Sequence, residues 1–227
     1  MIIGIVGRKH SGKSTITRMI VENNPNSVEL SFAKKLKQVC SKVFNLPMEY
    51  MEDQNLKEKP LSFNITLTYE QLEQIYSYYP GYEMDISKAN NLVGTLFTTP
   101  RYILQFIGTE FLRECLKRSI HLDVIEQRVA HFSSIDKNKI IIISDVRFQN
   151  EVDFVRETSL KYYDRPALVL GVDRPGLEKS SHPSEIEIEN LILKSDRLIN
   201  NNSTLTDLEL SIYSVLEENK LLANSKK

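Results

Sequence analysis

The sequence begins with an apolar run, residues 1–6, that leads directly into the pattern G-x-x-x-x-G-K-[ST] at residues 7–14. Such a run predicts a buried strand. A glycine-rich turn that opens a helix points several backbone N–H groups at one spot. Gly7 and Gly12 let the backbone turn tightly and approach an anion without a Cβ in the way. The pattern therefore predicts a phosphate-binding loop between a first strand and a first helix.

The last residues of the pattern carry the chemistry of the loop. Lys13 is expected to reach the β- and γ-phosphates of a nucleotide, and the Ser14 hydroxyl is expected to bind Mg²⁺. The positive end of the following helix dipole adds to the attraction for a polyphosphate. We therefore predict a site for ATP with Mg²⁺. The residues expected to hold the nucleotide are Gly7, Lys9, Ser11, Gly12, Lys13, Ser14 and Thr15.

The composition bounds the kind of protein that carries this loop. A chain of 227 residues, 41% hydrophobic and 26% charged, is long enough for one globular α/β domain. Its net charge of −1 argues against stable binding to nucleic acid through a basic face. Cys40 and Cys115 are expected to be buried thiols. No run is long enough to span a membrane and no signal peptide precedes the first strand, so a cytoplasmic protein is expected.

Strand-like runs alternate with helical stretches along most of the chain. This order predicts an α/β fold, in which helices cover both faces of a mostly parallel sheet in a three-layer α/β/α sandwich. Residues 139–145 are the strongest strand, and their four successive Ile residues are typical of a central parallel strand. Further strands are expected at 28–32, 167–172 and 197–199, and further helices at 33–44, 121–132, 149–158 and 206–222.

Residues 45–99 are the least regular part of the chain and contain three of its prolines. Because this block is too long for a plain loop, we interpret it as an insertion that shapes a substrate site. The core of the single domain would then be residues 1–44 and 100–222. Thr68 is expected to open a short helix within the insertion. The Tyr-rich stretch 76–82 suits base stacking and core packing equally.

Asp145 ends the Ile-rich strand, where a carboxylate is the usual partner of Mg²⁺ in a chain with a phosphate loop. The alternative is a helix-capping or turn Asp. Arg147 follows two residues later and suits bidentate phosphate recognition, although a surface ion pair is the other interpretation. Glu151 could orient Arg147 or simply be an acid in the first turn of a helix.

A second unusual segment begins at Thr99, a plausible N-cap, followed by Pro100 in the first helical turn. In an α-helix, Gln105, Gly108 and Thr109 would fall near one face. A Gln there could hydrogen-bond a base edge, and a Gly could admit a flat ring. A solvated helix face is the alternative.

Several segments together point to one family. The two most specific are Arg101-x-x-Leu-Gln-x-x-Gly-Thr-Glu-x-x-Arg113 and Ile143-Ser-Asp-Val-Arg-Phe-Gln-Asn-Glu151. The others are Ser31-Phe-Ala-Lys-Lys-Leu-Lys37, Ser181-His-Pro-Ser-Glu185, and Asp196-Arg-Leu-Ile-Asn200 with the Thr-Leu-x-Asp-Leu helix start that follows. In this order they resemble the deoxynucleoside monophosphate kinases of bacteriophages and related viruses. The resemblance covers most of the chain, and residues 45–99 match least.

The resemblance implies a P-loop fold of the nucleoside-monophosphate-kinase type, with about five parallel strands, an NMP-binding insertion and a lid at about 173–185. It implies transfer of the γ-phosphoryl group of ATP to a deoxynucleoside 5′-monophosphate. The implied catalytic residues are Lys13, Arg113, Asp145 and Arg147, with Arg174, Lys179 and His182 in the lid and Arg174 contacting ATP. The implied monophosphate side consists of Arg101, Gln105, Gly108, Thr109, Glu110, Arg113, Arg147 and Glu151. Ser14 stands where many members have Asp, and both can serve Mg²⁺.

Two other functions fit the same loop. One is a P-loop kinase of another small phosphorylated metabolite. The other is a nucleotide switch or motor ATPase, for which Glu110 and Glu151 are the candidates to position an attacking water. In the kinase interpretations the partners are small-molecule substrates, and the resemblance adds a homodimer as a further expectation.

Overall fold

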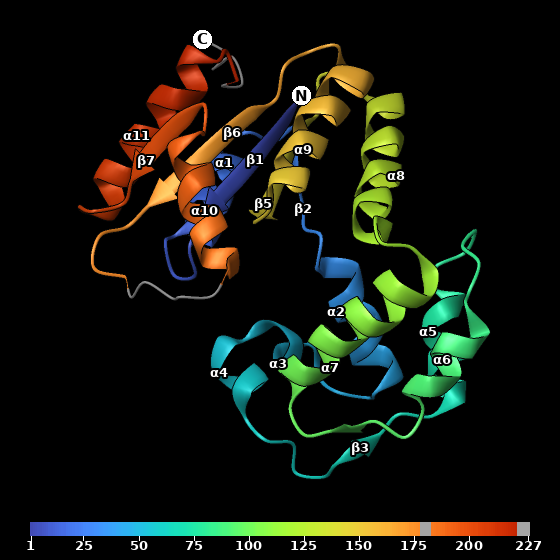
Figure 1. Ribbon diagram of the computed structural model, residues 1–227. Helices are drawn as coiled ribbons and strands as arrows, with labels where there is room; N and C mark the ends of the chain where they lie inside the picture. Colours follow the sequence, from blue (N-terminus) through green and yellow to red (C-terminus); the bar gives the residue numbers. More distant parts are fainter. Residues whose placement is uncertain (178–182, 222–227) are drawn as a thin grey trace. The chain divides into compact units, whose positions relative to one another are not determined.

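The computed structural model describes residues 1–177 and 183–221 of the chain. Lys179 and His182 of the expected lid therefore lie outside the described residues. The chain forms two compact units. Met1–Phe32 and Val124–Lys227 make up the first, here called the sheet unit, and Ala33–Asp123 make up the second, here called the helical unit. Figure 1 shows the elements of both units.

The sheet unit is built on five strands in the order β2-β5-β1-β6-β7, with every neighbouring pair parallel. The Ile-rich strand β5 lies inside the sheet between β2 and β1, as its unbroken apolar run predicts. This arrangement confirms the expected α/β fold with a parallel sheet. The strands are β1 (Ile2–Gly7), β2 (Ser27–Leu30), β5 (Ile140–Val146), β6 (Leu168–Asp173) and β7 (Arg197–Asn200).

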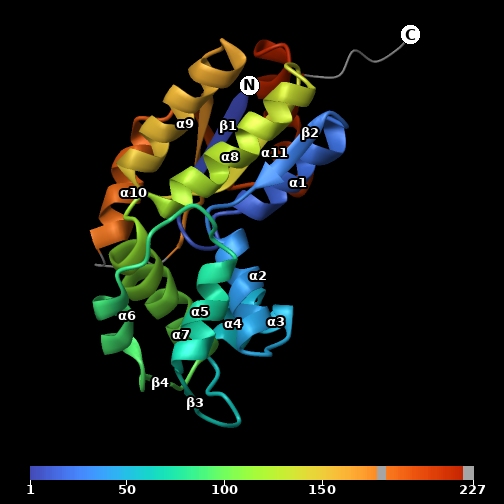
Figure 2. The same ribbon diagram turned by 90° about the vertical axis from the view of Figure 1, so that its right-hand side faces the viewer.

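Helices cover both faces of this sheet. In Figures 1 and 2, α9 and α10 lie on one side of the strands and α1 lies on the other. Ile140 and Ile142 belong to a buried core with residues of α1 and α11, whereas Ile141 and Ile143, equally buried, point to the opposite face. The helices of this unit are α1 (Lys13–Asn23), α9 (Gln149–Tyr163), α10 (Pro183–Leu193) and α11 (Leu205–Glu218), and α8 (Ile120–Ile135) leads into it from the helical unit.

The helical unit takes in more of the chain than the irregular block 45–99. It packs around buried aromatic residues, of which Phe97 makes edge-to-face contacts with Phe44, Tyr102 and Phe106. Its elements are α2 (Lys34–Val43), α3 (Met48–Glu52), α4 (Gln54–Glu58), α5 (Tyr69–Ser77), α6 (Ile86–Leu92), α7 (Pro100–Phe106), the π-helix η1 (Ile107–Leu116), and the antiparallel pair β3 (Ile65–Thr66) and β4 (Leu96–Phe97).

Two helix starts in this unit follow their sequence signals. The Thr68 hydroxyl accepts from the backbone N–H of Gln71, whose side chain accepts from the N–H of Thr68 in return, so α5 begins with a capping box. The Thr99 hydroxyl accepts from the N–H of Tyr102, and Pro100 occupies the first turn of α7. Both predictions of a capping residue are confirmed.

The Tyr-rich stretch packs within the helical unit. Tyr79 is 1% exposed, with the Lys35 ammonium 4.4 Å from its ring centroid. The Tyr76 hydroxyl donates to the carbonyl of Tyr82, and the Tyr82 hydroxyl donates to Asp123. Of the two interpretations of this stretch, these contacts favour packing. Cys40 and Cys115 are both buried free thiols, as predicted.

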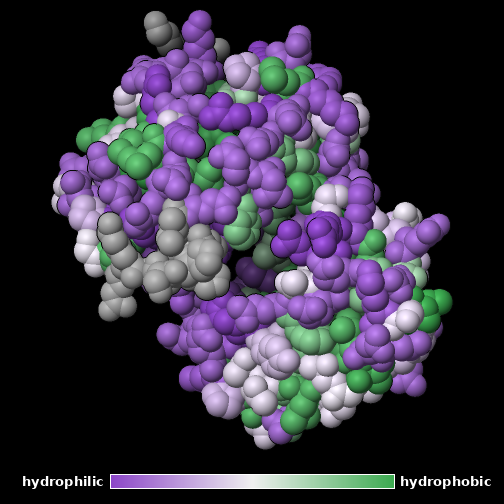
Figure 3. Space-filling model, viewed as in Figure 1, coloured by the Kyte–Doolittle hydropathy of each residue, from purple (hydrophilic) through white to green (hydrophobic). Residues whose placement is uncertain are grey.

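Apolar residues are scattered on the outer surface. Figure 3 shows mostly hydrophilic residues with separate apolar patches on this face. Among the described residues of the sheet unit, the most exposed large apolar side chains are Leu193 on α10, with 80% exposure, Ile135 at the end of α8, with 68%, and Leu205 and Leu210 on α11, with 65% each. Among the described residues, no helix combines the length and the apolar character that crossing a membrane requires.

Candidate phosphate-binding and catalytic site

The phosphate loop directly follows strand β1, at the carboxyl edge of the sheet, as expected. Gly12 caps α1 with φ 104°, and His10 also takes a positive φ of 65°. Glycine is needed twice in this loop. The left-handed backbone of Gly12 disfavours any side chain, and a Cβ on Gly7 would lie 2.9 Å from the carbonyl oxygen of Val172. The sequence pattern therefore reflects real steric limits of this turn.

Lys13 folds back over the loop. Its ammonium group donates to the carbonyl oxygens of Gly7 and Arg8, both at 2.6 Å. These bonds hold the charge beside the turn that the two glycines make, where a phosphate group would have to sit. Lys13 therefore lies where the sequence pattern predicts it.

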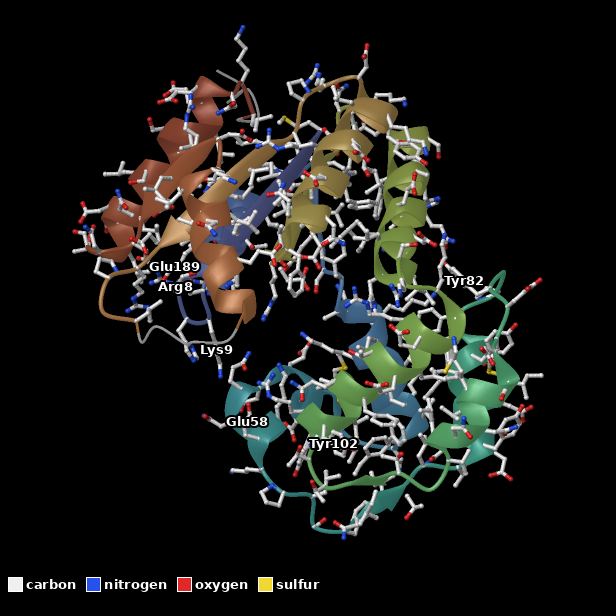
Figure 4. The ribbon with its side chains drawn as sticks, viewed as in Figure 1. Arg8, Lys9, Glu58, Tyr82, Tyr102 and Glu189 are labelled. Atoms are coloured by element: carbon white, nitrogen blue, oxygen red, sulfur yellow. The ribbon has the colours of Figure 1, made fainter. Side chains whose placement is uncertain are left out.

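The loop has the features that a polyphosphate requires. The Ser11 side chain is 1% exposed, and its hydroxyl has no hydrogen-bond partner among the described residues. A buried polar atom without a partner is costly, and a phosphate oxygen or an ordered water would supply one. Ser14 is exposed in the first turn of α1, and Lys9 is exposed in the loop. In Figure 4, Lys9 points away from the sheet. Thr15 is partly buried in the first turn.

Asp145 lies at a shift in register between the neighbouring strands β1 and β5. Gly4 pairs with Ile143 and Val6 pairs with Val146, so a single residue of β1 lies opposite Ser144 and Asp145 of β5. Such a bulge redirects side chains and is common beside active sites. It places Asp145 next to the strand that enters the phosphate loop, which fits its predicted role near Mg²⁺.

Neighbouring backbone and side chains fix the Asp145 carboxylate. The Ser31 hydroxyl donates to one of its oxygens at 2.7 Å, and the N–H of Phe32 donates to the other at 2.9 Å. Both donors follow β2, the next strand of the sheet. Asp145 is therefore not a helix cap. Its orientation is set by two fixed donors, and carboxylate oxygens with further lone pairs are suitable ligands for Mg²⁺.

Glu151 caps the helix that follows β5. Its carboxylate accepts from the backbone N–H groups of Arg147 at 2.7 Å and Phe148 at 3.2 Å. Burial raises the pKa of Glu151 to about 7, although these two bonds act in the opposite direction, and the nearby charge of Asp145 adds to the increase. Glu151 therefore lies in the first helical turn as an acid, and its bond to the Arg147 N–H also fixes the backbone of Arg147.

This pKa has a consequence for stability. Because the folded pKa of Glu151 lies above the ordinary value of 4.5, its stabilising contribution is complete below about pH 4.5 and is lost as the pH rises through about 7. Glu151→Gln keeps an oxygen for the two N–H groups and removes the titration. We expect the variant to lose part of the decrease in unfolding free energy between pH 5 and pH 8. Denaturant unfolding at several pH values measures this.

Glu157→Gln is the matched control, since Glu157 is exposed on the same helix. It should leave the pH dependence of the unfolding free energy unchanged. An equal pH dependence in wild type and Glu151→Gln would show that Glu151 does not titrate in this range.

Two cationic side chains lie near the phosphate loop in the sheet unit. Arg174 comes directly after β6, and its guanidinium donates to the carbonyl of His10 at 3.3 Å. Arg8 belongs to the loop itself and forms an ion pair with Glu189 of α10, as Figure 4 shows. Arg147 is exposed just beyond β5. The sheet unit thus brings together the phosphate loop, Asp145 and Arg174. Arg147 is the first residue after β5, the strand that contains Asp145.

Most residues of the expected monophosphate side lie in the helical unit, whereas Arg147 and Glu151 belong to the sheet unit. Here the predicted α-helical spacing is wrong after residue 106, because Ile107–Leu116 form a π-helix. Helices of this kind are rare, usually short, and frequent at functional sites. Their wider turn places residues four or five apart on one face. The exposed positions follow that spacing and are Gln105, Thr109, Glu110, Arg113 and Glu114.

Gly108 does not share this exposed face. It is buried, its carbonyl lies 3.3 Å from the His121 ring nitrogen Nε2, and a Cβ at this position would lie 3.0 Å from the Leu36 side chain. Gly108 therefore allows close approach to α2, rather than admitting a flat ring from outside.

Arg101 is held by a neighbouring helix of the same unit. Its guanidinium forms an ion pair with Glu58 at 2.5 Å and donates to Gln54 at 3.3 Å, both on α4. Figure 4 labels Glu58 on α4. An Arg fixed in this way keeps further N–H groups for an anion.

Sequence reasoning missed several partners of these residues. Sequence patterns indicate Ser31 only as part of a motif. They do not indicate Asn201, whose side-chain amide donates to the carbonyl oxygen of Ser11, or Glu189, the ion-pair partner of Arg8. Their roles arise from contacts between distant parts of the chain, and local patterns do not reveal such contacts. The one local signal is the Asp196–Asn200 motif, which leads directly to Asn201.

Two curated proteins are similar to this chain over nearly its whole length. The chain is 28% identical over 246 residues to the deoxynucleoside-5′-monophosphate kinase of Escherichia phage T5, covering 94% of this chain and 95% of that protein. It is 29% identical over 225 residues to a provisionally named deoxynucleotide monophosphate kinase of Acanthamoeba polyphaga mimivirus, covering 96% of each. This chain is homologous to viral kinases. The resemblance found in the sequence is thereby confirmed, and so is the prediction of a kinase, an enzyme that transfers phosphoryl groups between small molecules.

Other comparisons add little. No family model matches the chain. Among solved structures, dephospho-CoA kinase from Campylobacter jejuni matches 96% of both chains with 15% identity and a TM-score of 0.42. Similarity at that level supports no argument about this chain.

Proposed function

We propose that this kinase transfers the γ-phosphoryl group of ATP to deoxynucleoside 5′-monophosphates and so produces deoxynucleoside diphosphates. The observation that carries the proposal is the similarity, over nearly the whole chain, to two viral proteins named for kinase activity on deoxynucleotides. The phosphate loop, with Lys13 folded over it and Asp145 on the adjoining strand, supplies the expected donor site.

The residues present fit the chemistry of this reaction. The acceptor is already an anionic phosphate oxygen, so no general base is required, and catalysis consists of positioning and charge neutralisation. The loop N–H groups and Lys13 would hold the triphosphate, and Arg147 and Arg174 would neutralise charge on the transferring group. Each Arg can donate two parallel hydrogen bonds to phosphate oxygens.

Ser14 and Asp145 are the residues that would hold Mg²⁺. Among the described residues, no group of three or more His, Cys, Asp or Glu side chains could bind a metal by itself. This fits Mg²⁺, which keeps several waters and usually takes one or two protein ligands together with substrate phosphates. When bound, the ion would neutralise negative charge on the β- and γ-phosphates.

The helical unit is our candidate for the acceptor side. Its π-helix exposes Thr109, Glu110 and Arg113. The preceding helix α7 adds Gln105, which is exposed, and Arg101, which is held by Glu58. Arg113 and Arg101 would bind the monophosphate, and Gln105 can hydrogen-bond a base edge. We propose that residues 33–123 act as the acceptor-binding insertion of a single kinase domain, and that residues 173–185 act as its lid.

The remaining expectations belong to the same proposal. An enzyme that supplies precursors of dNTPs would work in the cytoplasm on small molecules and would need no stable contact with nucleic acid. Self-association as a homodimer stays a prediction of the family resemblance.

A panel of acceptors tests the proposal. Purified protein would be given Mg-ATP with each dNMP, each NMP and several phosphorylated metabolites, with a no-acceptor control. We expect diphosphate formation with one or more dNMPs. Phosphorylation of a metabolite alone would favour the other kinase interpretation, and equal ADP formation in every reaction would indicate an ATPase.

A further inference from the structure

Asn201 makes a long-range contact with the phosphate loop. It follows β7 directly, and its side-chain amide donates to the carbonyl oxygen of Ser11 at 2.8 Å, a bond that joins residues 190 positions apart. The same amide occupies the space that a Cβ on Gly12 would need. Gly12 thus leaves room for Asn201 as well as allowing the left-handed turn.

The backbone of Asn201 is itself fixed in the sheet unit. Its backbone N–H donates to the carbonyl oxygen of Asp173 at 2.7 Å, at the end of the neighbouring strand β6. Asn200, the residue before it, pairs with Asp173 in the parallel ladder. The side chain of Asn201 therefore reaches the loop from a rigid point at the carboxyl edge of the sheet.

This contact sets the direction of an N–H group. In a planar trans peptide, the C=O of one residue and the N–H of the next point in opposite directions. Holding the Ser11 carbonyl toward Asn201 therefore turns the Gly12 N–H away from it. The N–H groups at the start of α1 are those that bind a phosphate at a helix N-terminus.

We propose that Asn201 is a positioning residue for the phosphate loop, which holds the Ser11–Gly12 peptide in the orientation that binds a polyphosphate. This inference rests on the proposed function only in that the loop binds a triphosphate. It does not depend on the identity of the acceptor. Asn201 acts through the loop and contributes to the affinity for the donor.

Phosphate affinity can be measured without any turnover. Asn201→Ala removes the donor and leaves the backbone bond to Asp173 in place. Asn201→Asp keeps the size of the side chain and places a carboxylate against the Ser11 carbonyl. By calorimetry with magnesium tripolyphosphate and with Mg-ADP, we expect affinity to fall about 10-fold in the first variant and 10- to 100-fold in the second. The melting temperature should change little.

Asn202→Asp is the matched control, because Asn202 is exposed and the added charge lies one residue further on. It should bind tripolyphosphate like the wild type. In kinetic assays, Asn201→Ala should raise the KM for ATP and leave the KM for the acceptor unchanged. A merely structural Asn201 would instead lower the melting temperature without changing phosphate affinity.

Two results would overturn the inference in different ways. Equal tripolyphosphate and Mg-ADP affinities in wild type, Asn201→Ala and Asn201→Asp would remove the role of Asn201 alone. Failure of the wild type to bind either ligand would overturn the phosphate loop and, with it, the proposed function.

Discussion

Replacing Lys13 with methionine should reduce the rate of phosphoryl transfer about 10³-fold, the effect typical of losing a group that stabilises transition-state charge. The ammonium group lies 2.6 Å from two loop carbonyls and can exchange these contacts for phosphate oxygens. Methionine keeps the length of the side chain without the charge. Steady-state kinetics with saturating acceptor measure the effect.

Two further variants make this result interpretable. Lys13→Arg keeps the charge but carries it on a planar fork that does not match a compact ammonium, so it should also be strongly impaired. Lys194→Met removes an exposed cation at the end of α10 and should retain full activity. Near-normal turnover in Lys13→Met would show that the loop does not bind the reacting nucleotide.

Arg147→Ala should reduce turnover by about 10²–10³-fold while leaving the unfolding free energy nearly unchanged. The side chain is exposed, and the cap that Glu151 provides contacts only the backbone of Arg147, so truncation leaves the helix start intact. The effect should fall on kcat, because the guanidinium would contact the group in transfer rather than the whole nucleotide.

Arg18→Ala is the control for this variant. Arg18 is 67% exposed on α1, and its ion pair with Glu22 among the described residues is a long surface contact, at 3.9 Å. Its loss should change neither kcat nor stability. Arg147→Lys should recover part of the activity, since it restores the charge without bidentate geometry. Full activity in Arg147→Ala would remove Arg147 from the site.

Much of the fold of the sheet unit is predictable from local patterns. The four Ile residues before Ser144 carry no polar alternation because β5 is covered on both faces, and the glycines of the first loop meet real steric limits. In the helical unit, the capping residues Thr68 and Thr99 also act locally, so their helices begin where the sequence indicates. Such features depend on neighbours in the chain.

Features that depend on distant contacts escaped prediction. The segment 107–116 has apolar residues at spacings that suit an α-helix, and nothing in this local pattern indicates the π-helix that it forms. The bulge at Asp145 requires the register between β1 and β5, and the contact of Asn201 with Ser11 spans nearly the whole chain. The raised pKa of Glu151 depends on burial by the fold, although its place in the first turn of a helix is visible in the sequence.

The most direct test of the account follows the phosphoryl group itself. ATP labelled with ³²P at the γ-position would be incubated with the protein, Mg²⁺ and an unlabelled dNMP, and the products would be separated by chromatography. We predict label in the β-phosphate of the corresponding dNDP, and its loss in Lys13→Met. Label released only as inorganic phosphate, at the same rate with and without the dNMP, would contradict the account.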